Sequence, residues 1–145
     1  MTYAQICRAS LYLQQQEDLP FILASNDAFD QLADRRLPGP SHIGAYAIQV
    51  TTGREPVVTG KPSKSLGAHL TVLHGLDPTR TCMVGDRLDS DIAFGNGAGF
   101  HSLLVMTGCT TEELLLEKIN EAGCIPSDEL WWPDFRLESL GHLKQ

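Results

Sequence analysis

Hydrophobic positions in this chain alternate between helical spacing and short continuous runs. Three segments have apolar residues at the spacing of one helix face: residues 2–15, 41–51 and 63–74. Three short apolar runs are typical of buried strands: residues 20–24, 81–84 and 102–106. The polar, turn-rich segment 25–40 predicts no regular element. This alternation of helices and strands predicts an α/β fold with a parallel sheet.

The same pattern predicts which side chains face the core and where helices begin and end. Two helices have predicted inward faces: Ile43, Ala47 and Val50 in one, and Leu66, Leu70 and Leu73 in the other. Three N-terminal caps are expected. Ser41 would cap the first of these helices, and Asp89 or Ser90 would cap a helix that ends near residues 97–99. Thr110 and Glu113 would form a capping box for a helix that ends at Gly123. Gly75 is expected to end the helix over 63–74. Residues 130–143 predict a short strand and a weak helix.

The composition restricts the classes of partner. The chain has 145 residues, of which 42% are hydrophobic, as in a globular protein. Its formal net charge of -7 argues against nucleic-acid and anionic-membrane partners, because phosphate groups attract lysine and arginine. A small phosphorylated substrate stays compatible, since it needs only one or two local cations. No apolar run approaches the roughly 20 residues that span a bilayer. The first residues lack the basic start of a signal peptide, so a cytoplasmic location is expected.

Four cysteines are present, and their spacing suggests no metal site. Cys7, Cys82, Cys109 and Cys124 form no CxxC pair and no Cys/His cluster with zinc spacing. We therefore expect reduced, mostly buried thiols.

The sequence GDRLDSD, residues 85–91, directly follows one of the predicted strands. In a parallel sheet, Asp86 would lie at the carboxyl end of that strand, where α/β proteins bind ligands. Asp91 begins the next helix and can turn back towards the same crevice, whereas Asp89 suits capping. Carboxylates near a lysine suit Mg²⁺, a hard cation that takes oxygen ligands and bridges to phosphate. We expect Asp86 to bind Mg²⁺ directly, and Asp91 to orient a metal-bound water or Lys61.

A second motif, GKPS at residues 60–63, supplies that lysine. Pro62 is favoured at the first position of a helix, so Lys61 is expected at a helix N-terminus, where backbone N–H groups also favour an anion. This suits a phosphoryl group, whose oxygens carry the charge in transfer. Taken alone, GKPS is more often an ordinary helix start, and GDxxxxD an ordinary capped turn. Together, in this order, they favour a phosphoryl-transfer site.

These motifs and their flanking segments resemble the haloacid-dehalogenase (HAD) superfamily. The branch that they resemble comprises p-nitrophenyl, phosphoglycolate, pyridoxal and NagD-type phosphatases. GKPS resembles the third family motif, with Lys61 as the phosphate-binding lysine, and GDRLDSDIAFGNGAG resembles the fourth, with Asp86 as the magnesium ligand. LLVMTGCTTEEL and WWPDFRLESLGHL resemble the strand that follows and the closing segment. FILASNDAFD resembles part of the inserted cap domain, although the common T-N-x-D is one residue shorter here.

The resemblance covers nearly the whole chain and implies a domain organisation. Residues 1–56 would be the last part of an α/β cap domain, and residues 57–145 the C-terminal half of a Rossmann-like core. Asn26 and Asp27 would bind substrate, with simple turn formation as an equal alternative. Lys61 and Asp91 would have catalytic roles. The implied reaction is Mg²⁺-dependent hydrolysis of a small phosphoric monoester such as phosphoglycolate, pyridoxal phosphate or p-nitrophenyl phosphate. A homodimer is possible, since family members often dimerise through the cap.

One part of the family pattern is missing from the sequence. In the family, an aspartate after the first strand attacks phosphorus and forms an aspartyl phosphate, and a second aspartate two residues later protonates the leaving group. Both belong to a D-x-D-G-[TV] motif, which does not occur in this sequence. Asp89-Ser90-Asp91 has the spacing but no glycine after it. We therefore expect the nucleophile to lie outside this chain, in a longer protein, and the chain to be inactive alone.

Other interpretations remain open. Without a nucleophile, the chain could be a pseudo-enzyme that binds magnesium or phosphate, or an interaction module. A response-regulator receiver or a cation-ATPase phosphorylation domain is a weaker alternative, because in receivers the lysine follows the acidic cluster, and here it precedes it. With the family's first strands missing, the strand over 81–84 would lack a neighbour on one side. We expect a chain that is marginally stable, dimerised through that edge, or a fragment of a longer product.

Overall fold

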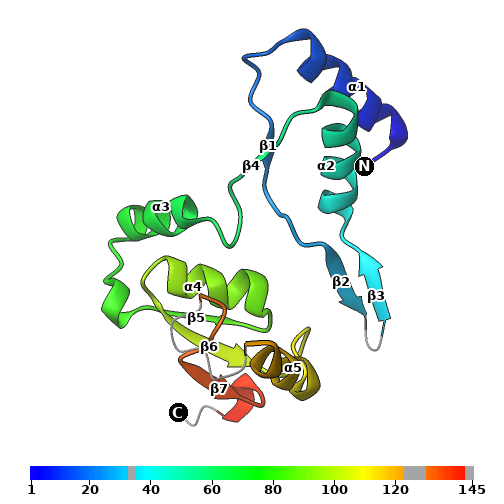
Figure 1. Ribbon diagram of the computed structural model, residues 1–145. Helices are drawn as coiled ribbons and strands as arrows, with labels where there is room; N and C mark the ends of the chain where they lie inside the picture. The colour runs from blue at the N-terminus through cyan, green and yellow to red at the C-terminus, as the bar shows by residue number, and fades with distance from the viewer. Residues whose placement is uncertain (33–34, 123–129, 143–145) are drawn as a thin grey trace. The chain divides into compact units, whose positions relative to one another are not determined.

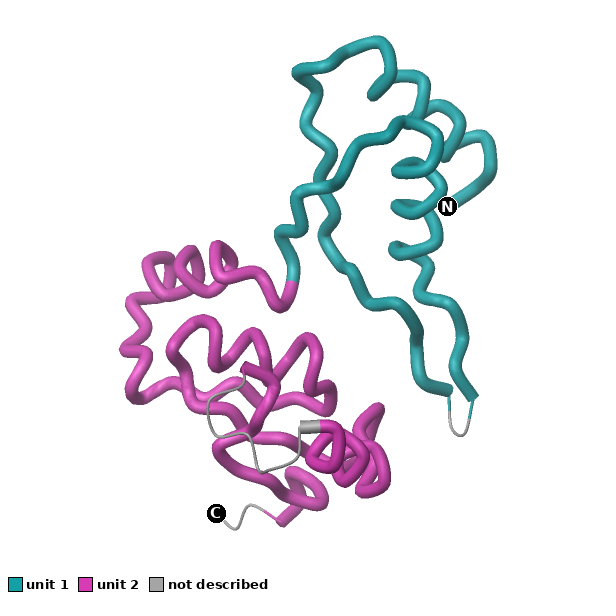
Figure 2. Tube along the Cα trace, viewed as in Figure 1, with its two compact units in different colours: residues 1–60 teal, residues 61–145 magenta. Residues whose placement is uncertain are grey.

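Two units divide the chain, Met1–Gly60 and Lys61–Gln145, called unit 1 and unit 2 below (Figure 2). The computed structural model describes residues 1–32, 35–122 and 130–142. Helices and parallel strands alternate along the chain, so the predicted α/β class is confirmed. Within the described residues, no helix is long and apolar enough to cross a lipid bilayer.

In the described part of unit 1, two helices and two short parallel strands accompany a β-hairpin (Figure 1). The two helices are α1 (Tyr3–Gln15) and α2 (Pro40–Thr52), and the two parallel strands are β1 (Ile22–Leu23) and β4 (Val57–Val58). Thr2 and Gln5 form a capping box at the start of α1, each side chain bonding the backbone N–H of the other. β1 pairs with β4, and the unit's core comprises Leu13, Leu23, Ala45 and Ile48.

A β-hairpin occupies the segment for which the sequence predicted no regular element. β2 (Phe29–Leu32) pairs antiparallel with β3 (Arg35–Pro38). The guanidinium of Arg36 lies 4.4 Å from the ring centroid of Phe29, so a cation–π contact joins the strands. The prediction was wrong because alternating apolar residues do not mark this hairpin. Cross-strand pairs, in which half of the residues are polar, stabilise it instead.

Helix α2 begins and packs differently from the prediction. Its N-cap is Gly39 and Pro40 follows at the first position, so Ser41 does not cap it. Ile43 and Val50 are exposed, while Gly44, Ala45 and Ile48 are buried. The Met1 sulfur lies 2.4 Å from where a Cβ on Gly44 would stand. Small residues therefore let α2 pack closely, and Ile43 and Val50 face outward.

Unit 2 is built on a three-stranded parallel sheet in the order β5-β6-β7. Its strands are β5 (Cys82–Gly85), β6 (His101–Val105) and β7 (Phe135–Leu137). The helical segments are α3 (Lys64–His74), η1 (Pro78–Arg80), η2 (Leu88–Ile92), α4 (Ala93–Gly97), α5 (Glu112–Ala122) and η3 (Leu140–His142). Leu88, Ile92, Leu104 and Leu115 form the core, against which both tryptophans pack. The predicted strand and helix of the tail are present up to residue 142, while residue 143 lies outside the described residues.

The strand predicted to be buried, β5, lies at an edge of this sheet. Cys82 is exposed, and Val84 keeps 37% of its surface exposed. The prediction of burial was therefore wrong, whereas the expected lack of a neighbouring strand on one side holds among the described residues.

The prediction that the cysteines are mostly buried was also wrong. Cys7 and Cys109 are only half-buried free thiols, and Cys124 lies outside the described residues.

Two further predicted caps differ in the structure. η2 begins after Arg87 with no side-chain cap, so neither Asp89 nor Ser90 caps it. The Thr111 hydroxyl accepts the N–H of Leu114 at the start of α5, while Thr110 is buried. Gly123, the expected end of that helix, lies outside the described residues. Gly75 ends α3 at a φ of 60°, as predicted. Leu73 was predicted inward but is exposed.

Candidate functional site

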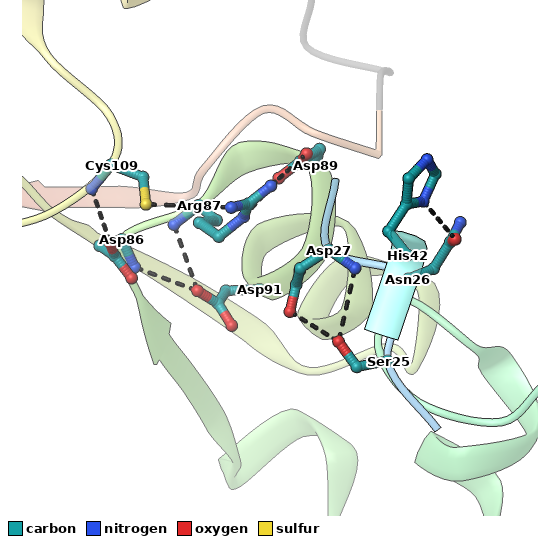
Figure 3. A network of polar contacts seen from close by, with 9 residues as sticks. All are labelled: Ser25, Asn26, Asp27, His42, Asp86, Arg87, Asp89, Asp91 and Cys109. Carbon is teal, nitrogen blue, oxygen red and sulfur yellow. Dashed lines mark hydrogen bonds and ion pairs between the residues drawn. The ribbon is translucent and has the colours of Figure 1, made fainter. Parts of the chain in front are cut away.

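Asp86 is the first residue after β5, at the carboxyl end of the strand (Figure 3). Its carboxylate accepts the backbone N–H of Cys109 at 2.6 Å, and its backbone carbonyl accepts the N–H of Thr110 at 3.0 Å. The turn after β6 therefore wraps around Asp86 and fixes its side chain. A Cβ on Gly108 would lie 1.9 Å from the carboxylate, so this turn requires glycine to approach closely.

Asp91 returns to the same strand end from η2, a turn of π-helix. The residue is 5% exposed, and its carboxylate accepts the backbone N–H groups of Asp86 and Arg87, each at 3.2 Å. A Cβ on Gly85 would lie 2.2 Å from the Cβ of Asp91, so Gly85 makes room for this return. π-helical turns are frequent at functional sites because they re-aim one side chain. Here the turn brings the two carboxylate-bearing residues together.

The Lys61 ammonium contacts the second oxygen of the Asp91 carboxylate. The lysine side chain is 42% exposed and that of Asp91 is 7% exposed. The ammonium is therefore held at the strand end by a buried anion while it stays accessible to solvent. The expected helix position of Lys61 was wrong, because α3 begins only at Lys64, after the N-cap Ser63. Its attachment to Asp91, rather than a helix N-terminus, positions the charge.

Two residues at this site were not predicted, Arg87 and Cys109. Arg87 forms an ion pair with Asp89 at 2.8 Å, and its guanidinium lies 3.9 Å from the Cys109 sulfur (Figure 3). Burial raises the pKa of the Cys109 thiol; the charge of Asp86 and a hydrogen bond to it raise it further, and Arg87 opposes them. The thiol is therefore neutral at neutral pH. Asp86 was predicted because ligands of α/β proteins bind at the carboxyl ends of parallel strands. Cys109 lies in the turn after the neighbouring strand β6, so the same rule could have predicted it.

Asn26 and Asp27 lie in unit 1, on the loop between β1 and β2. The Ser25 hydroxyl donates to the Asp27 carboxylate at 2.9 Å, and the Asp27 N–H donates to the same hydroxyl at 3.4 Å. The Asn26 side-chain oxygen lies 3.2 Å from Nδ1 of His42, near the start of α2. Sequence reasoning did not single out His42. These contacts order the loop, and the substrate-binding role of Asn26 and Asp27 stays a prediction.

The donor chemistry of unit 2 suits magnesium better than a soft metal. Within the described part of the chain, no group of three or more His, Cys, Asp or Glu side chains could hold a metal ion by itself. Zinc sites take three or four such ligands, whereas Mg²⁺ commonly binds one or two carboxylates and keeps several waters. Asp86 offers a carboxylate already fixed by a backbone N–H, so the residues present fit Mg²⁺.

Known proteins share the sequence pattern and the fold of this chain. A family model described as HAD-hydrolase-like matches residues 58–130. The chain belongs to this family. The HAD-like chain is 39% identical to phosphoglycolate phosphatase 2 of Arabidopsis thaliana, over 83% of this chain and 40% of that protein. The 4-nitrophenylphosphatase structure from Thermotoga maritima superposes with a TM-score of 0.78 and 30% identity, covering 99% of this chain and 50% of that one.

A third relative was solved with a metal. The glycerol phosphate phosphatase of Mycobacterium tuberculosis, in complex with magnesium, superposes with a TM-score of 0.76 and 25% identity. The match covers 100% of the HAD-like chain and 40% of that structure. These similarities identify the phosphatase branch that the motifs resemble, and the HAD-like chain spans half or less of the length of these relatives.

Proposed function

We propose that this HAD-like chain forms part of a magnesium-dependent phosphatase that hydrolyses a small phosphoric monoester. The observation that carries the proposal is the Lys61–Asp91 contact beside Asp86, at the end of β5. It combines an accessible cation with a fixed carboxylate, which are the two groups that phosphoryl transfer needs around the phosphate. The first listed relatives act on phosphoglycolate and 4-nitrophenyl phosphate by their names, which supports this substrate class.

In this proposal, each residue has a separate task. The Lys61 ammonium binds phosphate oxygens and stabilises the charge on the transferring group. Asp91 holds Lys61 in place and anchors the backbone of Asp86 and Arg87. Asp86 holds Mg²⁺, with the Cys109 N–H orienting its carboxylate. Magnesium, when bound, would neutralise charge on the phosphoryl group.

The nucleophile would come from a segment that this sequence does not contain, since no D-x-D-G-[TV] motif occurs in it. In the family's mechanism that segment supplies the aspartate that is phosphorylated and the aspartate that protonates the leaving group. Residues 1–56 would then serve as part of the cap, with Asn26 and Asp27 contacting the substrate, and residues 57–145 as part of the core. A cytoplasmic location and a homodimer remain predictions.

A phosphatase assay tests the proposal on the longest polypeptide that is encoded with this sequence. We expect p-nitrophenyl phosphate turnover that requires Mg²⁺ and stops with EDTA. Asp86→Ala should reduce it by at least about a hundredfold, because the metal ligand is lost. Asp89→Ala is the matched control, since that side chain is 68% exposed and pairs with Arg87 in the same turn. Turnover that persists in EDTA or in Asp86→Ala would contradict the proposal.

The missing motif also favours a second candidate, a pseudo-enzyme that binds magnesium or phosphate without turnover. The coding region upstream of Met1 discriminates between the two. A reading frame with D-x-D-G-[TV] supports the phosphatase. Its absence, together with Mg²⁺ binding that Asp86→Ala abolishes and no turnover, supports the pseudo-enzyme.

A further inference from the structure

Arg87 is the less exposed of two cations, Lys61 and Arg87, at the candidate site. Its side chain is 10% exposed, whereas that of Lys61 is 42% exposed. Lys61 is therefore accessible to a phosphate in solvent, while the Arg87 guanidinium is enclosed by protein. Withdrawal from water restricts a charged group to the protein acceptors around it. The contacts of Arg87 therefore act on the protein itself.

The Arg87 guanidinium joins two turns, one after β5 and one after β6 (Figure 3). On its own turn, Nε and Nη2 donate to the two oxygens of the Asp89 carboxylate at 3.1 Å and 2.8 Å. On the turn after β6, Nη1 donates to the Cys109 sulfur at 3.9 Å. The planar guanidinium makes these bonds together because its N–H groups point in fixed, different directions. Arg87 therefore ties the turn that carries Cys109 to the turn that follows Asp86.

Cys109 connects Arg87 to the Asp86 carboxylate. Its backbone N–H donates to that carboxylate at 2.6 Å, and a hydrogen bond from its thiol to Asp86 contributes to the raised pKa of Cys109. A sulfur that accepts from a guanidinium directs its own hydrogen elsewhere, and an ionised carboxylate can only accept. The hydrogen bonds therefore run in one direction, from Arg87 through Cys109 to Asp86.

We propose that Arg87 is a positioning residue for Asp86, which it fixes for Mg²⁺ binding by holding the turn that carries Cys109. The proposal rests on the proposed function, because it assigns a task towards the same magnesium site. A role of Arg87 through its charge alone has the opposite sign. A cation beside a metal site repels Mg²⁺, so removal of its charge alone would raise the Mg²⁺ affinity, whereas loss of positioning lowers it.

Calorimetric titration with Mg²⁺ separates these two effects by their sign. Arg87→Met keeps an unbranched side chain and removes the guanidinium. We expect the Mg²⁺ affinity to fall by about tenfold, and amide hydrogen exchange at the Cys109 N–H, measured by NMR, to become faster. Asp89→Ala is the control, since it removes an exposed partner and leaves the guanidinium beside Cys109. Its affinity should stay within about twofold of the wild type. A raised or unchanged affinity in Arg87→Met would overturn the proposal.

Variants of Cys109 test the connection to Asp86. Cys109→Ser keeps a group that accepts from Arg87 and donates to Asp86, so it should bind Mg²⁺ as the wild type does. Cys109→Val keeps the backbone N–H but loses both side-chain contacts, and should lose affinity as Arg87→Met does. Because Cys109→Val retains the charge of Arg87, it tests the same connection should Arg87→Met fail to fold. Wild-type affinity in Cys109→Val would overturn the proposal.

The double variant Arg87→Met/Cys109→Val shows whether the two residues act together. It should bind Mg²⁺ no more weakly than either single variant, because both substitutions break the same connection. Additive losses would overturn the proposal. A wild type that binds no Mg²⁺ would instead refute the proposed function. Exchange at the Cys109 N–H would then decide the positioning role by itself, and equal rates in Arg87→Met and the wild type would overturn it.

Discussion

At the scale of single residues, two glycines make room for the carboxylates of the candidate site. A Cβ on Gly108 would lie 1.9 Å from Oδ2 of Asp86, so Gly108→Ala must displace that carboxylate from the Cys109 N–H. We expect the Mg²⁺ affinity measured by calorimetry to fall by about tenfold. Gly97→Ala is the control, because its added methyl meets nothing closer than 3.7 Å. Equal affinity in Gly108→Ala and the wild type would show that the turn does not position Asp86.

Asp91 also determines the stability of unit 2. Asp91→Ala leaves two backbone N–H groups and the Lys61 ammonium without their acceptor, and the carboxylate that it removes is nearly buried. We expect the free energy of unfolding in urea to fall by about 2–4 kcal/mol. Asp89→Ala, which removes an exposed ion pair, should cost less than about 1 kcal/mol. Equal losses in the two variants would contradict the anchoring role of Asp91.

At the scale of elements, a glycine in the left-handed region ends α3. Gly75 has a φ of 60°, and a Cβ there would meet nothing within 4 Å. Gly75→Ala therefore adds conformational strain without a clash. We expect it to lower the free energy of unfolding by about 1 kcal/mol, measured by urea denaturation. Gly97→Ala, inside α4, should be neutral or stabilising, and an unchanged stability in Gly75→Ala would contradict the conformational argument.

The elements differ in how far the sequence predicts them. Helix ends at glycine and strands with continuous apolar runs were predicted, because their signals are local. The β2–β3 hairpin was not, since it depends on cross-strand contacts such as Arg36 with Phe29. The exposed face of α2 was not predicted either, because the close approach at Gly44 depends on tertiary packing. Lys61, Asp86 and Asp91 could be selected from the sequence because each belongs to a local motif. The hydrogen bond from the Cys109 N–H to Asp86 could not, because it depends on how the turn after β6 packs against β5.

At the scale of the whole molecule, the edge position of β5 affects stability. A three-stranded sheet with an uncharged edge strand leaves backbone groups unpaired, and the chain spans half or less of the relatives compared above. We expect the isolated chain to melt below the range of about 45–65 °C that is common for single domains, or to dimerise. Differential scanning calorimetry at two protein concentrations distinguishes these outcomes. A cooperative monomer that melts at high temperature would contradict the prediction.

The proposed function depends on a magnesium site at Asp86, at the end of β5. An NMR titration of the ¹⁵N-labelled chain with Mg²⁺ tests it most directly, because it requires neither a substrate nor the missing nucleophile. We expect saturable shifts of the amides around Asp86 and Cys109, lost in Asp86→Ala and kept in Asp89→Ala. A titration of Asp86→Ala indistinguishable from that of the wild type would contradict it.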